Sequence, residues 1–436
     1  MKRLLSSILA IALACALMFG AIPAAHAAVV EVTIPHYKSG ENVGAQYFLP
    51  MVERFNAEFE GRFKVTIEEI VQDMYKDKIK QLGQQNMLPV VIEGGIDADW
   101  FYDVIVANNL FYDLKDFVDA HPNIKAFFHP DNYAYNTTAD GKLATLPTPF
   151  VFQMTMYYNS AVWTPSRSIN DMSWADVAAD LGDAKIAFMT AENAWTTMLS
   201  LSSMIAAQPG GAELLNTSIR AEDRIRDFSH PALVAAFAEL QTILQNHATA
   251  NTIGAAYADA ANIFMNNGAA IIANGSWMIG DFGPDSADKW GEGFNPDTVH
   301  AAVLPGNVAL ANPIGEGWWI PSNLPAEQIE LGLAFLEFMN RPEELEAQML
   351  LFGGSIPGFE HSEAYLAALA ENRLMYEYMT APDANTIIVR TFSDAIVPSV
   401  ADPEFGKLLP KLMDGSLTPE AFAAELTKKA AETALD

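Results

Sequence analysis

Trp277 stands directly after a short apolar run, in the stretch "FMNNGAAIIANGSWMIGDF" from Phe264 to Phe282. The run Ala269–Ala273 is too short to cross a membrane and has the length of a buried strand. Gly275 frees the backbone at the strand end and Ser276 can cap a helix, which leaves Trp277 facing outward. An indole there can pack against the C–H face of a sugar ring while nearby polar groups hold the hydroxyls. The alternative is a core residue, as some of the eight tryptophans must be.

Polar side chains follow two other segments that are rich in β-branched residues, "VVEVTIPHY" and "LPVVIEGG". Both segments are predicted strands, and in open parallel sheets ligands bind beyond the carboxyl ends of the strands. The paired glycines that end the second segment also let a ligand approach the backbone closely. The candidate ligand contacts are therefore His36, Tyr37 and Glu41 after the first strand, and Glu93 and Asp97 after the other. A single histidine is often structural, so His36 could be either a structural residue or a ligand contact.

The elements that must position these residues alternate between strand and helix patterns. Strands are predicted at residues 29–37, 62–70 and 88–95, and an extended segment runs from 143 to 163. Helical spacing of apolar residues is found at 48–59, 74–86, 174–181, 231–245, 326–340 and 417–435. This alternation implies an α/β fold in which helices cover both faces of a parallel sheet. The length favours two domains, and the absence of a Ser/Gly linker favours lobes joined by crossing strands.

The N-terminus has the composition of a secretory signal peptide. Met1-Lys2-Arg3 is basic, residues 4–22 are apolar, and Ala25-His26-Ala27 fits a cleavage site. We predict cleavage after Ala27 and export to the periplasm, with a mature protein that lacks disulfides because the single cysteine is Cys15. Two alternatives stay open: an uncleaved anchor helix, and a lipoprotein signal in which Cys15 becomes the lipidated N-terminus.

Charge and missing motifs narrow the functional classes. The chain has 54 acidic and 25 basic residues, which disfavours nucleic acid and anionic membrane surfaces as partners. It contains no H-E-x-x-H, no G-x-S-x-G and no Walker A sequence, and no metal site or cofactor is expected. We predict a protein that is not an enzyme. A secreted glycan-active enzyme remains the alternative class, since a catalytic carboxylate pair could stand anywhere among the acids.

Several segments, taken together and in order, match one family pattern. They are "VTIPHYKSGEN", "FNAEFEGRFKVTI", "LPVVIEGG", "LPTPFVFQMTMYYNSAVW", "SINDMSWADVAADL", "FMNNGAAIIANGSWMIGDF", "GEGWWIP", "AFLEFMNRPE" and "GGSIPG". Each segment alone is a weak signal, whereas their common order over nearly the whole chain is a strong one. In these segments the chain resembles the extracellular solute-binding proteins of ABC importers, in the group with the maltose- and glycerol-3-phosphate-binding proteins.

The resemblance implies a two-lobed periplasmic-binding-protein type II fold, with crossing hinge segments between two α/β lobes that close on a solute. By that pattern lobe 1 is residues 28–147 plus 311–354, and lobe 2 is residues 148–310 plus 355–436. It implies a monomer that delivers a small solute to the transmembrane subunits of an ABC permease. Two-lobed binders can also present their closed form to a chemoreceptor, so a signalling role can coexist with transport.

The family pattern adds further candidate site residues. Tyr75 opens a helix where the family often points a side chain into the cleft, and Arg390 lies where the glycerol-phosphate branch carries a cleft arginine. The residues added in this way are Tyr75, Trp195, Gly317, Trp318, Trp319 and Arg390, with one of the adjacent tryptophans expected to face the ligand. Arg390 could equally pair with a carboxylate.

The sequence departs from the glycerol-phosphate branch at two places. The crossing segment is apolar at residues 149–152, where that branch is rich in Ser and Thr, and Ser355 replaces the tyrosine of a "GYLP" loop. The first change removes hydroxyl partners and the second removes a phenol, which favours a neutral carbohydrate as the solute. A sugar phosphate or another non-carbohydrate solute is the alternative.

Overall fold

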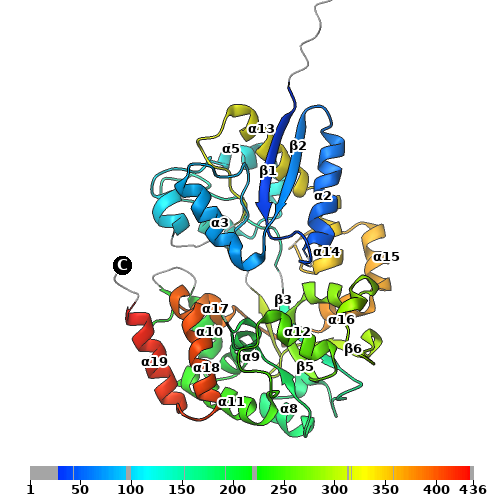
Figure 1. The fold of residues 1–436 in the computed structure, drawn as a ribbon, viewed down its shortest axis with the longest axis vertical. Coiled ribbons are helices and arrows are strands. Elements are labelled where there is room, and N and C mark those ends of the chain that lie inside the picture. Colours follow the sequence, from blue (N-terminus) through cyan, green and yellow to red (C-terminus); the bar gives the residue numbers. More distant parts are fainter. Residues whose placement is uncertain are drawn as a thin grey trace, which may run out of the picture.

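The chain folds into two groups of elements that lie one above the other in Figure 1. The computed structural model describes residues 28–42, 44–94, 100–151, 153–191, 193–218, 223–311, 314–315, 317–356 and 358–432. The predicted signal peptide and Asp97 lie outside the described residues. We use lobe 1 for the group that contains the N-terminal strand and lobe 2 for the group that contains the C-terminal helix.

Lobe 1 is built on two parallel strands, β1 (Val30–His36) and β2 (Phe63–Glu69), which pair in register from Val30 and Phe63 to His36 and Glu69. Its helices are α2 (Ala45–Glu58), α3 (Gln72–Gln84), η1 (Phe101–Val106), α5 (Lys115–Ala120), α6 (Pro122–Lys125), α7 (Pro130–Tyr135), α13 (Ala326–Met339) and α14 (Pro342–Phe352). The strands and helices predicted between residues 29 and 86 are confirmed to within two residues at most ends.

The third strand predicted for lobe 1, residues 88–95, is wrong as a ladder strand. Within the described part of this segment, only Ile92 makes a bridge, and its partner is Trp319 rather than a residue of β1. Pro89 has no N–H to donate to a ladder, and Pro35 has none in β1. The segment is nevertheless buried at Val90, Val91 and Ile92, which explains its apolar composition.

Lobe 2 contains a six-stranded mixed sheet in the order β4 (Ile186–Ala187), β5 (Ile271–Gly275), β3 (Gln153–Asn159), β7 (Val308–Ala311) and β8 (Ile387–Val389), with β6 (Val299–Ala302) also paired to β3. The expected parallel pairing holds for β4 with β5 and for β7 with β8. β3 runs antiparallel to β5, β6 and β7, because it enters the sheet from the lobe 1 side, at the end where β5 and β7 finish.

Helices surround the lobe 2 sheet (Figure 1). They are η2 (Ile169–Asp171), α8 (Trp174–Leu181), α9 (Trp195–Ala206), α10 (Gly211–Thr217), α11 (Pro231–His247), α12 (Tyr257–Met265), η4 (Ser276–Phe282), η5 (Pro284–Lys289), η6 (Pro296–Thr298), α15 (Glu363–Glu371), α16 (Arg373–Thr380), α17 (Phe392–Ala395), η7 (Val400–Glu404), α18 (Phe405–Met413) and α19 (Pro419–Glu432). Local sequence sets several of these ends. Ser173 and Asp176 form a reciprocal capping box on α8, and Pro419 opens α19.

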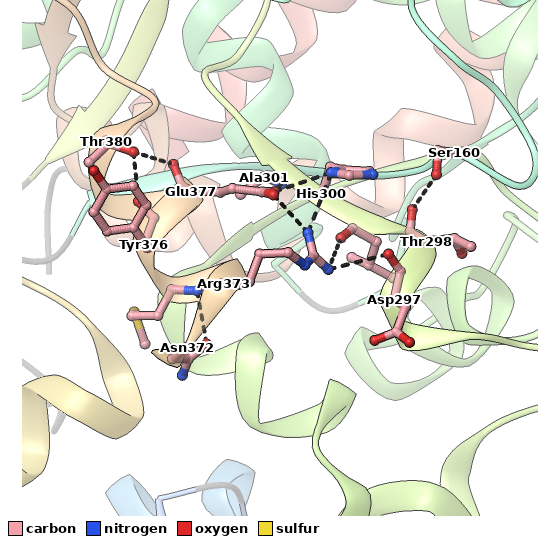
Figure 2. A network of polar contacts seen from close by, with 12 residues as sticks. Ser160, Asp297, Thr298, His300, Ala301, Asn372, Arg373, Tyr376, Glu377 and Thr380 are labelled. Carbon is pink, nitrogen blue, oxygen red and sulfur yellow. Dashed lines mark hydrogen bonds and ion pairs between the residues drawn. The ribbon is translucent and has the colours of Figure 1, made fainter. Parts of the chain in front are cut away.

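A polar network fastens α16 to the edge strand β6 (Figure 2). The Arg373 guanidinium donates to Glu377 Oε1 at 2.7 Å and to the Val299 carbonyl at 2.9 Å. Glu377 Oε2 lies 3.3 Å from His300 Nδ1. The helix fixed in this way carries Tyr378, whose hydroxyl donates to the Gln153 carbonyl at the start of β3. The network therefore supports the point at which the chain enters lobe 2.

The buried apolar residues form separate cores in the two lobes. The lobe 1 clusters draw on residues 34–146 and 318–352, and the lobe 2 clusters draw on residues 154–310 and 374–430. A smaller cluster at the junction contains Phe150, Leu345, Met349, Ile356 and Tyr365. The residue at which each lobe begins and ends stays a prediction.

The crossing segments lie against one another. Leu146 pairs with Trp318 and Val151 pairs with Ser355, both antiparallel. Gly317 is required at this crossing, because a Cβ atom there would lie only 1.6 Å from the Leu146 carbonyl oxygen. Gly315 is two residues away, and among the described residues no heavy atom beyond its chain neighbours lies within 4 Å of the position that its Cβ would take.

We expect Gly317→Ala to lower the free energy of unfolding by about 2 kcal/mol or more, because the added methyl must displace backbone atoms. Gly315→Ala is the matched control and should be neutral or slightly stabilising, since it only restricts the unfolded chain. Urea unfolding of the two variants beside the unchanged protein measures the difference. Equal stabilities would contradict the close approach of the two crossing segments.

Candidate functional site

The candidate residues gather at the facing sheet edges of the two lobes. In lobe 2, Gly275 of β5 is paired with Met154, and Ala311 of β7 is paired with Gln153, so these strands end where β3 begins. Val389 of β8 is paired with Leu310, which places Arg390 at the same edge as Trp277. In lobe 1, β1 runs toward lobe 2 and ends at His36 (Figure 1). The carboxyl ends of the strands in both lobes therefore face the junction, where α/β proteins bind ligands.

His36 is the centre of an aromatic stack in lobe 1 and is fully buried. Its ring lies 5.3 Å from Trp318 at an interplanar angle of 8°, and 4.3 Å from Phe48 at 26°. Tyr37 is stacked against the His36 ring at a centroid distance of 4.9 Å, and Tyr75 is tilted against the same ring at 5.6 Å. Four aromatic rings therefore surround His36 at the end of β1.

A charged pair lies beside this stack. Lys38 Nζ is 2.6 Å from Glu93 Oε1, and His36 Nε2 is 3.0 Å from Glu93 Oε2. The Lys38 backbone N–H donates to His36 Nδ1 at 3.0 Å, so the ring proton is on Nε2, which faces the carboxylate. Glu93 is 18% exposed and Lys38 is 21% exposed, which leaves both partly accessible.

The pKa values in this cluster follow from burial and from the Glu93 charge. Burial lowers the pKa of His36 and outweighs the opposing effect of Glu93, so the imidazole is neutral. Burial alone would raise the pKa of Glu93, but Lys38 and His36 together lower it to about 2. Burial raises the pKa of Tyr37 and of Tyr75, and the charge of the Glu93 carboxylate adds to both shifts. Tyr75 donates its hydroxyl proton to the Glu93 carbonyl at 3.3 Å.

The lobe 2 side of the junction is aromatic. Trp277 and Trp195 are both half-buried, with ring centroids 5.5 Å apart, and Tyr257 lies 6.3 Å from Trp195. Trp277 packs against the buried cores of both lobes. Tyr257 and Asn274 exchange a hydrogen bond at 3.2 to 3.3 Å, and burial raises the pKa of Tyr257 to about 12.

Two local roles proposed for the turn before Trp277 need correction. Gly275 is needed less for backbone freedom than for space, because the Trp277 ring folds over it and a Cβ would lie 2.2 Å from that ring. Ser276 does not cap η4. Its hydroxyl donates to the Phe352 carbonyl at the end of α14, which ties lobe 2 to lobe 1.

The remaining candidates lie in different surroundings. Glu41 is exposed in the loop after β1. Trp318 is 8% exposed within the stack, whereas Trp319 is fully buried in the lobe 1 core beside Phe101. Gly317 is held against Leu146. Arg390 is 8% exposed, and its backbone N–H donates to Asn216. Solute contact by each of these residues stays a prediction.

Two further residues join the site that local sequence does not single out. Asn274 directly precedes the Gly275-Ser276-Trp277 turn, so its position was available as a signal. Tyr257 is 17 positions away from Asn274 along the chain and reaches the site only through the packing of α12.

An ion pair also joins the lobes away from the crossing segments. Lys76 on α3 and Asp402 in η7 form it at a distance of 3.4 Å.

Two classes of feature are missing from the described part of the chain. It contains no group of three or more His, Cys, Asp or Glu side chains that could hold a metal ion. No helix within it combines the length and the hydropathy that a membrane span needs.

Residues 50–375 match the family model of the bacterial extracellular solute-binding proteins. The chain belongs to this family. Members are receptors rather than enzymes, so the alternative of a glycan-active enzyme is set aside. Among curated protein sequences, none matches this solute-binding protein.

Solved structures of similar proteins share the fold over almost the whole chain. A chitin oligosaccharide binding protein has a TM-score of 0.71 and 18% identity, over 93% of this chain and 99% of that one. A Streptococcus pneumoniae solute-binding protein in complex with the blood group A-trisaccharide gives 0.67 and 18%, over 92% and 98%. The sugar-binding protein MalE from Xanthomonas citri gives 0.64 and 16%, over 92% and 97%. The predicted two-lobed type II fold is confirmed.

The charge of Glu93 should make the stability of this solute-binding protein depend on pH in acid. Its pKa is lowered from 4.5 to about 2 on folding, so its stabilising effect is complete above pH 4.5 and is lost as the pH falls toward 2. Between pH 7 and pH 3 we expect the unfolding free energy of the unchanged protein to fall by about 2 kcal/mol more than that of Glu93→Gln.

Asp119→Asn is the control for this measurement. Lys115 and Lys125 also lower the pKa of Asp119 to about 2, but the carboxylate is solvent-exposed and water screens the interaction. Urea unfolding between pH 7 and pH 3 should show a clearly smaller difference for Asp119→Asn. An equal fall in the unchanged protein and in Glu93→Gln would show that Lys38 and His36 do not stabilise the carboxylate.

Proposed function

We propose that this protein captures a carbohydrate at the junction of its two lobes and delivers it to an ABC permease. The observation that carries the proposal is the pairing of two unlike faces at the facing sheet edges. Lobe 2 presents the half-buried indoles of Trp195 and Trp277, and lobe 1 presents the partly exposed Lys38–Glu93 pair beside a ring stack. Sugar rings have an apolar C–H face and a rim of hydroxyls, and this site offers a surface for each.

The charges of the lobe 1 face favour a neutral solute. Lys38 is a donor, ionised Glu93 is an acceptor, and the two charges cancel while His36 stays neutral. A sugar hydroxyl both donates and accepts, so it can bind to either member of the pair. The structural neighbours support the same class, because their names refer to chitin oligosaccharide, a trisaccharide and raffinose. An identity of 16 to 18% carries the fold but not the substrate.

A sugar phosphate or another charged solute is the second candidate. Arg390 favours it, because this residue lies at the same strand edge as Trp277 and its guanidinium could pair with an anion. Against it, the crossing segment has the apolar residues Pro149, Phe150 and Val151 at positions where hydroxyl side chains could have bound an anion.

Capture is proposed to occur by closure about the crossing segments. The contacts Leu146–Trp318 and Val151–Ser355 are single bridges rather than extended ladders. A few backbone angles there can therefore change while each lobe core stays intact. The protein is proposed to act as a monomer after export, either free in the periplasm following cleavage after Ala27 or tethered through a lipid on Cys15.

A thermal-shift screen of the mature chain, Ala28–Asp436, tests the proposal. The probes are chitotriose, xylotriose, raffinose and galactose, with glycerol-3-phosphate as the charged solute. Ligand at a hundred times its dissociation constant stabilises the folded protein by about 2.7 kcal/mol, which raises the melting temperature measurably. We expect a carbohydrate to give this shift and to be recovered unchanged.

Trp277→Ala should abolish the carbohydrate shift. Trp290→Ala is the matched control, because Trp290 is also a half-buried indole of lobe 2 but packs on Phe294 rather than on Trp195. It should keep the shift even if its melting temperature is lower. A shift with glycerol-3-phosphate alone would replace the carbohydrate assignment with the charged one.

A further inference from the structure

Ala194 adopts a left-handed backbone conformation, with φ at 49° and ψ at 37°. Among the described residues other than glycine, four more have a positive φ, and all four are asparagines: Asn86, Asn109, Asn267 and Asn307. Asparagine tolerates this region, whereas alanine pays about 1 kcal/mol for the crowding of its Cβ. Ala194 is therefore the one strained non-asparagine position in the described chain, and it directly precedes Trp195.

Hydrogen bonds from the first turn of α9 and from residues 252–254 hold the start of the loop that contains Ala194. In the first turn of α9, the Thr196 hydroxyl accepts from the Met189 N–H at 3.1 Å, and the Thr197 hydroxyl donates to the Met189 carbonyl at 2.6 Å. The Thr190 hydroxyl donates to the Thr252 carbonyl at 2.7 Å and accepts from the Gly254 N–H at 2.8 Å. A strained residue persists where its surroundings determine the conformation several times over, as they do here.

The methyl group of Ala194 completes this arrangement. Ala194 is fully buried and belongs to the main core of lobe 2. Replacement by glycine would therefore remove packing contacts, and it would also remove the restriction that the Cβ atom places on the backbone angles. The Ala194 carbonyl accepts the first hydrogen bond of α9, from the Met198 N–H at 2.9 Å. The left-handed turn therefore sets the direction in which α9 begins.

The side chain that this loop presents is Trp195. All other residues of α9 are buried, whereas Trp195 is half-buried and contacts Trp277 and Tyr257 at the lobe junction. The backbone N–H of Trp195 donates to the Asn193 side-chain oxygen at 3.1 Å. The buried, hydrogen-bonded loop thus leads directly to Trp195, whose ring lies at the edge of the proposed site.

We propose that Ala194 is a positioning residue that holds Trp195 in its solute-binding orientation before the solute arrives. The inference rests on the proposed function and deepens it by assigning the preorganisation of the aromatic face to one strained alanine. Ordering a flexible side chain on binding reduces affinity, and a ring that is already held avoids this loss. Strain at a site of this kind is a recognised route to preorganisation.

The test is Ala194→Gly in the mature protein labelled with 5-fluorotryptophan, with Trp195→Phe used to assign the Trp195 fluorine resonance. Relief of strain and loss of a buried methyl oppose each other, so the melting temperature should change little. We expect the Trp195 resonance to shift or broaden in the unliganded protein. Affinity for chitotriose, xylotriose or raffinose, measured by calorimetry, should fall about three- to tenfold.

Asn86→Gly is the control, because it makes the same backbone change at a left-handed position in lobe 1, just after α3. It should leave both the Trp195 resonance and the affinity unchanged. An unaltered resonance and an unaltered affinity in Ala194→Gly would overturn the inference. If none of the three oligosaccharides binds the unchanged protein, the proposed carbohydrate function fails, and the fluorine spectrum alone decides whether Ala194 holds Trp195.

Discussion

The structure depends on the close contact of the segments that cross between the lobes. Leu146 and Trp318 pair across the crossing, and the contact leaves no space for a side chain at Gly317. The same contact sets the direction in which β3 enters lobe 2, antiparallel to β5 and β7. Strand ends in both lobes consequently face one another, and residues from distant parts of the sequence meet at the junction. The position of the site follows from this geometry before any side-chain chemistry is considered.

The two faces at the junction hold their side chains by different means. In lobe 1, a neutral His36 and a charged Lys38 together stabilise a mostly buried carboxylate, so electrostatics fixes the polar groups. In lobe 2, ring packing and a strained loop fix Trp195 and Trp277. In the proposed capture, a solute between the lobes contacts both faces, and each face supplies a different kind of contact.

Much of the fold could be predicted because its signals are local. Helices such as α8 and α11 have the predicted apolar spacing, and β1, β2 and β5 have β-branched or small apolar runs. The third strand of lobe 1 was predicted from the same kind of run, yet it makes only one bridge, because burial alone produces an apolar sequence without a ladder. The antiparallel course of β3 could not be predicted, since pairing direction depends on where the chain re-enters the sheet.

The sequence by itself determined the family, the α/β class and the set of rings and charges available to a solute, because these depend on residue type and order. Only the tertiary structure decided which of them lie together. It placed Trp318 in the His36 stack and Trp319 in the core, although the two are adjacent in sequence, since successive side chains of an extended segment point to opposite faces. It also brought Tyr257 to Trp195 and Glu93 to Lys38. Those contacts join residues far apart along the chain, and only the folded backbone brings them within reach.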